Sequence, residues 1–300
     1  MTSLRIYSQL SGGLGNQMFQ FAAGVSAAHR LDCALELDVS LFGVDGLRSF
    51  LLERFCIDVA VASGVEIEAL RAGLVSRGRV GQLWSQARGA GKTDKIYRQP
   101  GFHFDAQGWP KVGPGSLLVG YFQSERYFAD VAPQIRDLFR LKHPVSEGGQ
   151  KVFAQIRSTD VAVALHIRRG DYVGSNKVNQ VHGTCSPDYY RRAIQIMGGL
   201  TEKRVTYFVF SDDTVYAAEF AAELDCAVVV EGSVERPWED MILIAACHHQ
   251  IIANSSFSWW GAWLNDRDAK IVIAPRNWFQ RDAMLINNTV DLYPADWITL

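Results

Sequence analysis

The feature that most constrains the fold is the alternation of strand-like and helix-like segments over residues 160–274. Residues 160–166 form a continuous apolar run, as expected for a parallel strand with both faces covered. The other expected strands are 206–211, 227–231, 250–254 and 270–274, and the expected helices are 189–197, 215–224, 237–247 and 259–264. This order predicts a doubly wound α/β domain.

The first half of the chain carries the same alternation less regularly. Strands are expected at 4–10, 34–38 and 116–122, and helices at 16–30 and 129–141. Residues 59–101 are polar and rich in Gly and Arg, which indicates helices and loops of a variable segment. The Pro- and Gly-containing residues 142–150 are a candidate linker, so we expect domains at 1–150 and 151–300.

Bulk charge and cysteine content exclude several classes of protein. The net charge of −2 gives no general attraction to nucleic acid or anionic lipid, so a positive field for an anionic ligand must be local. Five cysteines without a CxxC pair argue against a disulfide framework or a zinc cage and favour a reducing compartment. The N-terminus lacks the pattern of a signal peptide. We therefore expect a cytoplasmic protein, with peripheral association at a membrane face left open.

The first candidate site is SGGLGNQ, residues 11–17, between a predicted strand and helix. Its glycines, Gly13 and Gly15 among them, let the backbone approach a ligand, and a helix N-terminus favours anions. The stretch fits the dinucleotide fingerprint GxGxxG poorly. A tight turn that needs glycine for its dihedral angles explains the glycines equally well. Asn16 and Gln17 favour a functional site, because an amide both donates and accepts hydrogen bonds.

The second candidate site is AVALHIRRGD, residues 162–171, where an apolar strand delivers His166, Arg168, Arg169 and Asp171 to its carboxyl end. Ligands bind at that end in open α/β sheets. Two arginines there suit a diphosphate, since a guanidinium group matches phosphate oxygens in pairs. The alternative is a solvated basic loop with Asp171 as a local salt-bridge partner.

Two further strands end in polar residues. In YFVFSDD, residues 207–213, an acidic side chain such as Asp212 can accept hydrogen bonds from guanine, or Ser211 or Asp212 can cap the next helix. In IIANSSFSWWGAWL, residues 251–264, a strand leads at once into a helix whose start offers free N–H groups and the hydroxyls of Ser255 and Ser256. Simple N-capping is the alternative there, and core packing is the favoured role of the tryptophans.

These segments together resemble the family 11 glycosyltransferases, the α-1,2-fucosyltransferases, in their bacterial form. The matching stretches are GGLGNQMFQFAAG (12–24), GYFQSERYF (120–128), HIRRGDYV (166–173), FSDD (210–213) and ANSSFSWWGAWL (253–264). The set spans nearly the whole chain. The HxRRxD element at 166–171 is also similar to α-1,6- and protein O-fucosyltransferases.

The resemblance implies a GT-B architecture, two Rossmann-like domains with parallel sheets facing across a cleft. It implies that residues 151–300 hold the donor and residues 1–150 lie on the acceptor side. The implied reaction is inverting, metal-independent transfer of L-fucose from GDP-β-L-fucose to the 2-hydroxyl of a terminal galactose. The residues themselves agree with the absence of a metal. Asp212 and Asp213 are adjacent and form no DxD pair, whereas arginines and a helix start can neutralise the leaving diphosphate. We expect no cofactor and no bound metal.

The expected catalytic groups are Arg168, Asn16 and Asp171. Arg168 stabilises the departing β-phosphate, and Asn16 reaches the junction of fucose and acceptor. Asp171 is the general base only if it faces the cleft. Donor-binding roles are expected for Gly13, Gly15, His166, Arg169, Asp212, Ser255, Ser256 and Phe257. Within that set, Arg169 supports either the loop or Asp171. The two serines and the Phe257 N–H complete the diphosphate cradle. His166 and Asp212 face the ribose or guanine.

Two other functions stay open at this point. The chain could use a different GDP-sugar, such as GDP-mannose, or it could be a non-catalytic carbohydrate-binding protein, given its eight tryptophans. The expected partners are GDP-fucose and a galactose-terminated oligosaccharide or lipid-linked glycan, with no nucleic acid. Residues 59–101, the least regular part of the first half, are where we expect acceptor selectivity.

Overall fold

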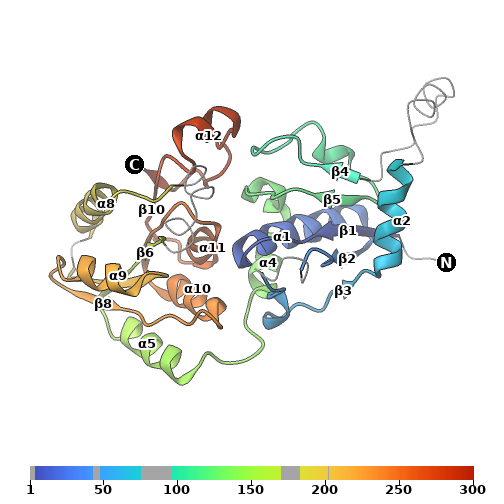
Figure 1. Ribbon diagram of the computed structural model, residues 1–300. Helices are drawn as coiled ribbons and strands as arrows, with labels where there is room; N and C mark the ends of the chain where they lie inside the picture. Colours follow the sequence, from blue (N-terminus) through green and yellow to red (C-terminus); the bar gives the residue numbers. More distant parts are fainter. Residues whose placement is uncertain (1–3, 43–47, 76–95, 170–182, 202) are drawn as a thin grey trace. The chain divides into compact units, whose positions relative to one another are not determined.

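The computed structural model describes residues 4–42, 48–75, 96–169, 183–201 and 203–300. The chain divides into two compact units, each built on a parallel sheet (Figure 1). Unit 1 comprises Met1–Arg140 and Val290–Leu292, and unit 2 comprises Leu141–Thr289 and Tyr293–Leu300.

The sheet of unit 1 has the strand order β3-β2-β1-β5-β4. All its pairings are parallel, and β1 lies in the centre with the register Arg5↔Ala34 to β2 and Tyr7↔Leu117 to β5. The strands are β1 (Arg5–Gln9), β2 (Ala34–Asp38), β3 (Ala60–Val61), β4 (Ile96–Arg98) and β5 (Leu117–Val119). The helices are α1 (Leu14–Leu31), α2 (Gly64–Val75) and α4 (Ala132–Leu138), with 3-10 turns η1 (Leu52–Arg54), η2 (Trp109–Lys111), η3 (Glu125–Tyr127) and η4 (Ala129–Val131).

Helix α1 is the core element of unit 1. Almost every residue from Leu14 to Ala28 is buried, which is unusual for a helix beside a sheet. This burial explains why residues 14–29 include no Asp, Glu, Lys or Arg. The helix approaches the sheet closely at Gly24, where a Cβ atom would lie 2.9 Å from Leu35 Cδ1 and 3.1 Å from Ser8 Cβ. A larger residue at this position would therefore push α1 off the sheet.

The sheet of unit 2 has the order β11-β10-β9-β6-β7-β8, again with all pairings parallel. Its central strand β6 is buried along its whole length. The strands are β6 (Val161–Ile167), β7 (Val205–Ser211), β8 (Ala227–Val229), β9 (His249–Ile251), β10 (Val272–Ala274) and β11 (Ile298–Thr299). The helices are α5 (Glu147–Arg157), α8 (Pro187–Leu200), α9 (Thr214–Ala221), α10 (Pro237–Ala246), α11 (Ser256–Leu264) and α12 (Arg281–Ile286).

Two apolar clusters cover the two faces of this second sheet. One contains Tyr190 and Met197 of α8 and Phe220 of α9, and the other contains Ile156 of α5 and Ile244 of α10. This confirms the doubly wound prediction. Trp259, Trp260 and Trp263 of α11 are 0%, 0% and 2% exposed, so the favoured core role of the tryptophans is also confirmed.

The sheet orders locate the ligand-binding edge of each unit. In unit 2 the chain runs from β6 through β7 to β8 at one edge, and then from β9 through β10 to β11 at the other. The order therefore reverses between β6 and β9. In unit 1 the corresponding reversal is between β1 and β5. Ligands of open α/β sheets bind outside the carboxyl ends of the strands at such a reversal.

Several expected boundaries differ from the observed ones. Helix α11 begins at Ser256 rather than 259, and strands β3 and β4 occur where only helices and loops were expected. The units divide at 140/141, before the expected boundary at 150, because residues 147–150 already belong to α5. Ser146 caps that helix and hydrogen-bonds to Glu239 of α10, which ties the supposed linker to unit 2.

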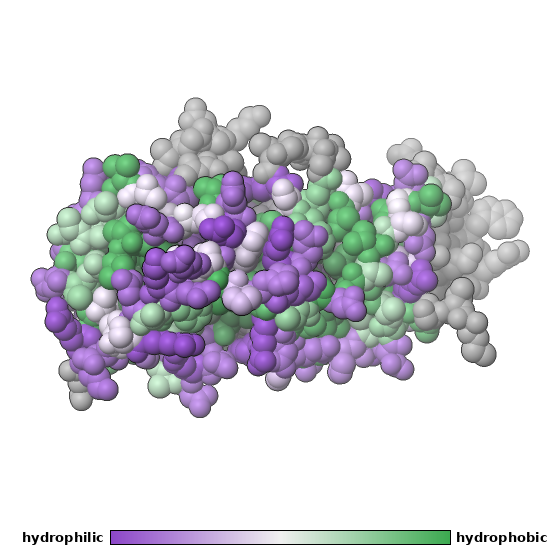
Figure 2. Space-filling view, turned by 90° about the horizontal axis from the view of Figure 1, so that it is seen from below, coloured by the Kyte–Doolittle hydropathy of each residue, from purple (hydrophilic) through white to green (hydrophobic). Residues whose placement is uncertain are grey.

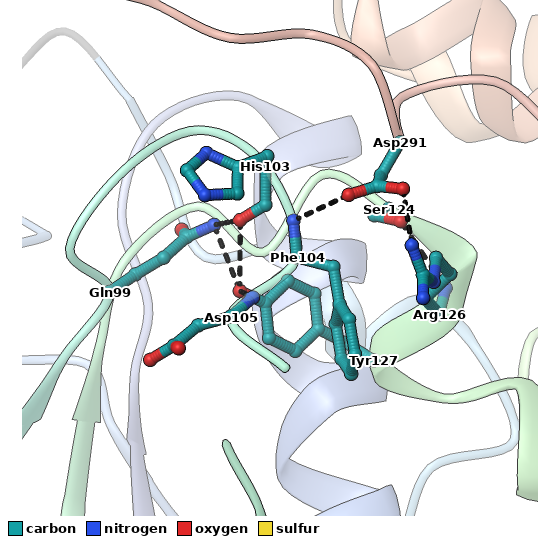
Figure 3. Close-up of polar contacts among 8 residues, drawn as sticks. All are labelled: Gln99, His103, Phe104, Asp105, Ser124, Arg126, Tyr127 and Asp291. Carbon is teal, nitrogen blue, oxygen red and sulfur yellow. Dashed lines mark hydrogen bonds and ion pairs between the residues drawn. The ribbon is translucent and has the colours of Figure 1, made fainter. Parts of the chain in front are cut away.

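Residues Val290–Leu292 are part of unit 1 although the chain on both sides belongs to unit 2. The carboxylate of Asp291 accepts a hydrogen bond from the Phe104 N–H at 3.2 Å and forms an ion pair with Arg126 (Figure 3). These contacts hold the segment against unit 1. No pattern in the sequence indicates this return of the chain to unit 1.

Candidate active site

The carboxyl ends of β6 and β9 meet at the reversal in the sheet of unit 2. The two strands pair in the register Leu165↔Ile251, so the residues that follow them leave the sheet side by side. The rings of His166 and Phe257 have their centroids 5.6 Å apart. The end of β6 and the start of α11, two of the predicted segments, therefore form one corner.

Arg168 is held at this corner by an ion pair. Its Nη1 atom lies 2.8 Å from Oδ2 of Asp212, which follows β7. The other carboxylate oxygen of Asp212 accepts a hydrogen bond from the Arg169 N–H at 2.8 Å. Asp212 thus binds the chain leaving β6 with both oxygens and orients Arg168. The structure shows that Asp212 positions Arg168 through this ion pair. A direct contact of Asp212 with the nucleotide stays a prediction.

Arg169 faces a different set of partners. Its Nε atom donates to Asp213 at 3.2 Å, and its guanidinium carbon lies 4.0 Å from the centroid of the Tyr216 ring. These are the contacts of an arginine that supports the loop after β6. Asp213 is also the N-cap of α9, because its carboxylate accepts from the Tyr216 N–H. The alternative that Ser211 or Asp212 caps this helix is therefore wrong, because the cap is Asp213.

His166 is the buried polar residue at the end of β6. Only 4% of its surface is exposed, and its buried Nδ1 atom has no hydrogen-bond partner among the described residues. Burial, reinforced by the charge of Arg168, lowers the pKa of His166 to about 3. The imidazole is therefore neutral at pH 7 and can exchange a hydrogen bond with a ligand without adding charge.

The start of α11 completes the corner. Ser255 is the N-cap, and its Oγ atom accepts from the Phe257 N–H at 3.3 Å. The Phe257 N–H therefore donates to the cap, as the capping alternative proposed. In the predicted diphosphate cradle, a phosphate oxygen would have to compete with Ser255 Oγ for this N–H. Ser256 is half-buried, and its hydroxyl has no partner in the described part of the chain. Ser256 is the better candidate for binding an anion here.

Asp240 is a candidate that the sequence analysis missed. It lies in the first turn of α10 against Gly232, which follows β8. A Cβ atom on Gly232 would be 2.3 Å from Asp240 Oδ2. Burial, with a further contribution from Glu239, raises the pKa of Asp240 to about 7. No partner for its carboxylate occurs within the described ranges. A half-buried carboxylate without a donor at the ligand-binding edge is a candidate for contacting a ligand.

A family comparison decides what kind of enzyme this corner belongs to. The model of glycosyl transferase family 11 matches residues 99–300, which include the whole of the corner. The chain is a family 11 glycosyltransferase.

Relatives of this glycosyltransferase cover its whole length. An α-1,2-colitosyltransferase of Escherichia coli is 30% identical over 98% of both chains. The O-antigen biosynthesis glycosyltransferase WbnK of E. coli is 34% identical over 98% of this chain and 100% of that protein. Galactoside α-(1,2)-fucosyltransferase 1 of Saimiri sciureus is 24% identical over 86% of this chain and 64% of its own.

Three solved fucosyltransferase structures share this fold. A mutant of Arabidopsis thaliana FUT1 in complex with GDP superposes with a TM-score of 0.56, at 14% identity over 97% of this chain and 75% of that chain. POFUT1 with GDP-fucose gives a TM-score of 0.50, at 15% identity over 90% and 98% of the two chains. NodZ of Bradyrhizobium also gives 0.50, at 13% identity over 87% and 93%. The likeness confirms the predicted GT-B fold class.

The edge of the sheet in unit 1 holds the other predicted group of the glycosyltransferase. Gly13 is the N-cap of α1 and Gly15 lies in its first turn, while the positive φ of +74° belongs to Gly12. Asn16, also in the first turn, accepts a hydrogen bond through Oδ1 from Gln123 Nε2 at 2.8 Å. Gln17 is structural, because it bonds to the backbone of Gly12, Ser49 and Leu51.

Asp171, the predicted conditional base, lies outside the described residues. In the part of the chain that the structure covers, no cluster of three or more His, Cys, Asp or Glu side chains could hold a metal ion. His248 and His249 accept backbone hydrogen bonds from Ala162 and Ile271 and stabilise the sheet. Both imidazoles therefore link neighbouring strands of the sheet.

A cavity of about 730 Å³ adjoins the corner in unit 2. Its lining includes Asn254, the residue before Ser255, and also Arg192, Arg276 and Arg281. The cavity is large enough for a sugar, and the three arginines supply hydrogen-bond donors in its lining.

No helix within the described ranges is both long and apolar enough to cross a membrane. On the face shown in Figure 2, hydrophobic patches are separated by hydrophilic side chains. All five cysteines are free thiols.

Proposed function

We propose that this glycosyltransferase moves L-fucose from GDP-β-L-fucose to the 2-hydroxyl of a terminal galactose, with inversion at the fucose anomeric carbon. The observation that carries the proposal is the corner between β6 and β9. There an oriented arginine, a neutral buried histidine and a helix start meet at the ligand-binding edge. Such a corner suits a nucleotide diphosphate. The α-1,2 linkage is supported by the names of the relatives, which include an α-1,2-colitosyltransferase and α-(1,2)-fucosyltransferases.

Arg168 acts on the leaving group in this proposal. When the bond from fucose to the β-phosphate breaks, negative charge grows on GDP and must be stabilised. Arg168 is already oriented by Asp212, so its guanidinium group needs little rearrangement to bind the β-phosphate. The Ser256 hydroxyl and the N-terminus of α11 add uncharged donors. His166 contacts the ribose side as a neutral group.

Asp240 is assigned to the guanine base. An ionised carboxylate can accept hydrogen bonds from the ring N–H and the exocyclic amine of guanine together. Asp212, the residue predicted for this role, already uses both oxygens within the protein. Asp240, in the first turn of α10, lies against Gly232, which follows β8. Strand β8 is two strands from β6 in the sheet, which is about 10 Å. An extended nucleoside diphosphate spans that distance.

On the acceptor side, Asn16 is assigned to the junction of fucose and galactose, with Gly13 and Gly15 close to the sugar. An amide cannot remove a proton, so Asn16 orients groups and a carboxylate has to act as general base. Asp171 is the proposed base, as the carboxylate two residues after Arg169 in the sequence. The enzyme works in the cytoplasm, on a galactose-terminated oligosaccharide or a lipid-linked glycan.

A second donor is favoured by one specific observation. The 30% identical relative is named for colitose, which is L-fucose without its 3-hydroxyl. The corner of unit 2 binds the GDP part, which is common to both donors. Only contacts to the 3-hydroxyl would distinguish them.

The test is incubation of the enzyme with GDP-fucose, GDP-colitose or GDP-mannose and a panel of β-galactosides, with the linkage determined by NMR. An α-1,2-fucosyl galactoside is the expected product. Exclusive use of GDP-colitose would move the proposal to the second donor. No turnover with any GDP-sugar, and no binding of GDP by calorimetry, would favour a carbohydrate-binding protein.

Chelation of metals tests the arginine account. We expect full activity after dialysis against EDTA, because Arg168 and the start of α11 supply the charge stabilisation that a divalent cation supplies elsewhere. Initial rates with and without added Mn²⁺ or Mg²⁺ measure this. A strict requirement for either ion would contradict the proposed role of the corner.

A further inference from the structure

Residues 120–123, which follow β5 in unit 1, have an unusual backbone. Phe122 has φ of +52°, in the left-handed region that a bulky side chain rarely adopts. Its ring is fully buried, so the conformation is not a feature of a loose surface loop. Strained backbone that is held in place by its surroundings is concentrated at functional sites.

Specific contacts hold this conformation. The Oε1 atom of Gln99 accepts from the N–H groups of both Tyr121 (3.0 Å) and Phe122 (2.9 Å). The Phe122 ring packs edge-on against Tyr127, with centroids 5.1 Å apart. Figure 3 shows how Tyr127 is fixed in turn, since its hydroxyl accepts from Asp105 N–H and lies within hydrogen-bond reach of Gln99 Nε2. The strain at Phe122 is therefore maintained by a network of contacts.

The strained turn leads into Gln123, whose own bonding is incomplete. The side chain is 6% exposed, and its Nε2 atom donates to Asn16 Oδ1 at 2.8 Å. Its Oε1 atom is buried and has no hydrogen-bond partner among the residues that the structure describes. A buried acceptor without a donor destabilises a fold. Gln123 therefore adds little to the stability of the fold, and its one side-chain hydrogen bond within the described part of the chain is the bond to Asn16.

Gln20 is a matched comparison in the same unit. It is also buried, at 2% exposed, but its amide is fully used. Its Oε1 accepts from the Ser11 N–H, and its Nε2 donates to Ser11 Oγ and to the Gly120 carbonyl. Gln20 therefore stabilises the edge of the sheet, whereas Gln123 has one partner and one unsatisfied atom.

We propose that Gln123 is a positioning residue for Asn16 and, through it, for the sugar at the reaction centre. The bond from Gln123 occupies Asn16 Oδ1 and turns Asn16 Nδ2 away from it, over the bare Cα of Gly12. No partner for Asn16 Nδ2 occurs within the described residues. Asn16 is thereby presented as a donor, which fits a sugar oxygen as its ligand. This inference rests on the proposed role of Asn16 at the junction of fucose and acceptor.

The test compares Gln123→Met with Gln20→Met in the full-length enzyme. Methionine keeps the length and removes both amide atoms. For Gln123→Met we expect kcat about 100-fold lower, because a misplaced reacting group has that effect. We expect an unchanged KM for GDP-fucose and a melting temperature equal to or above that of the wild type, since the unsatisfied oxygen is gone. Gln20→Met loses satisfied bonds, and its melting temperature should fall.

Gln123→Glu is a second variant, in which the new side chain has nearly the same size and shape as glutamine. A carboxylate accepts but does not donate, so Asn16 would turn its Nδ2 inward and present its oxygen to the sugar. We expect kcat to fall as far as in Gln123→Met. A wild-type kcat in both variants would overturn the inference, as would a melting temperature for Gln123→Met that falls like that of Gln20→Met. Lack of transfer by the wild-type enzyme would instead contradict the proposed function.

Discussion

Replacing Arg168 by alanine is expected to lower kcat by about 10²–10³-fold, the usual effect of removing one preorganised donor from a developing oxyanion. The fold should survive. Arg168 and Asp212 are 23% and 25% exposed, and partly exposed ion pairs contribute little to the free energy of unfolding. Steady-state kinetics with GDP-fucose, beside the melting temperature of each variant, measures both effects.

Two further variants control for this result. Arg191→Ala removes an arginine that pairs with Glu223 on the surface and should leave kcat and the melting temperature unchanged. Asp212→Asn keeps Arg168 but weakens its orientation, so we expect a smaller loss of kcat, about 10-fold. If Arg168→Ala kept the kcat of the wild type, the leaving-group role would be wrong.

Asp240→Asn is expected to weaken GDP binding by about 100-fold and at the same time to stabilise the fold at pH 8. The amide can accept only one of the two guanine donors, and its NH₂ group opposes the other. Isothermal titration with GDP measures the first effect. The second effect follows from burial, which disfavours the ionised carboxylate in the folded protein.

The pH dependence of that stabilisation has a definite sign. The pKa of Asp240 is raised to about 7 in the folded protein, while an unfolded aspartate has its ordinary value near 3.8. Above pH 7 the carboxylate is ionised in both states, so the folded state carries the full penalty of burial. Between pH 7 and 4 the folded state binds a proton that the unfolded state does not, and the penalty disappears. The difference in melting temperature between Asp240→Asn and wild type should therefore be largest above pH 7 and vanish near pH 4.

The adjacent carboxylate is the natural control for Asp240. Glu239 accepts hydrogen bonds from the Ser146 N–H (3.0 Å) and hydroxyl (2.6 Å), so it is a structural group. Glu239→Gln should lower the melting temperature and leave the affinity for GDP unchanged. Equal affinity of Asp240→Asn and wild type for GDP would remove Asp240 from the guanine site.

The second sheet could be predicted well from the sequence, because its fully buried central strand restricts which residues can form it. All residues of β6 are buried, and such a strand needs a continuous apolar run and covered faces. The strands β3 and β4 escaped prediction, since segments of two or three residues at a sheet edge carry no periodicity to detect. Their placement depends on pairing with β2 and β5, which are distant in sequence.

Sequence patterns predict less of the site where contacts between segments decide a role. The pattern predicts Asp212 as a ligand for guanine, which stays a prediction, and the structure adds that its two oxygens bind the end of β6. Adjacent carboxylates on a helix do not by themselves indicate a site, and the packing of the Asp240 carboxylate against Gly232 distinguishes it from Glu239. Gln123 lies in a stretch that the resemblance contained, but its link to Asn16 spans 107 residues and needs the turn at Phe122.

The most direct test is a crystal structure of the enzyme with GDP. The central claim is that fixed donors at the ends of β6 and β9 hold the diphosphate without a metal ion. The expected structure has the β-phosphate within hydrogen-bond distance of Arg168 and Ser256, with guanine against Asp240. A diphosphate bound through a divalent cation, or bound at the start of α1 in unit 1 instead, would contradict it.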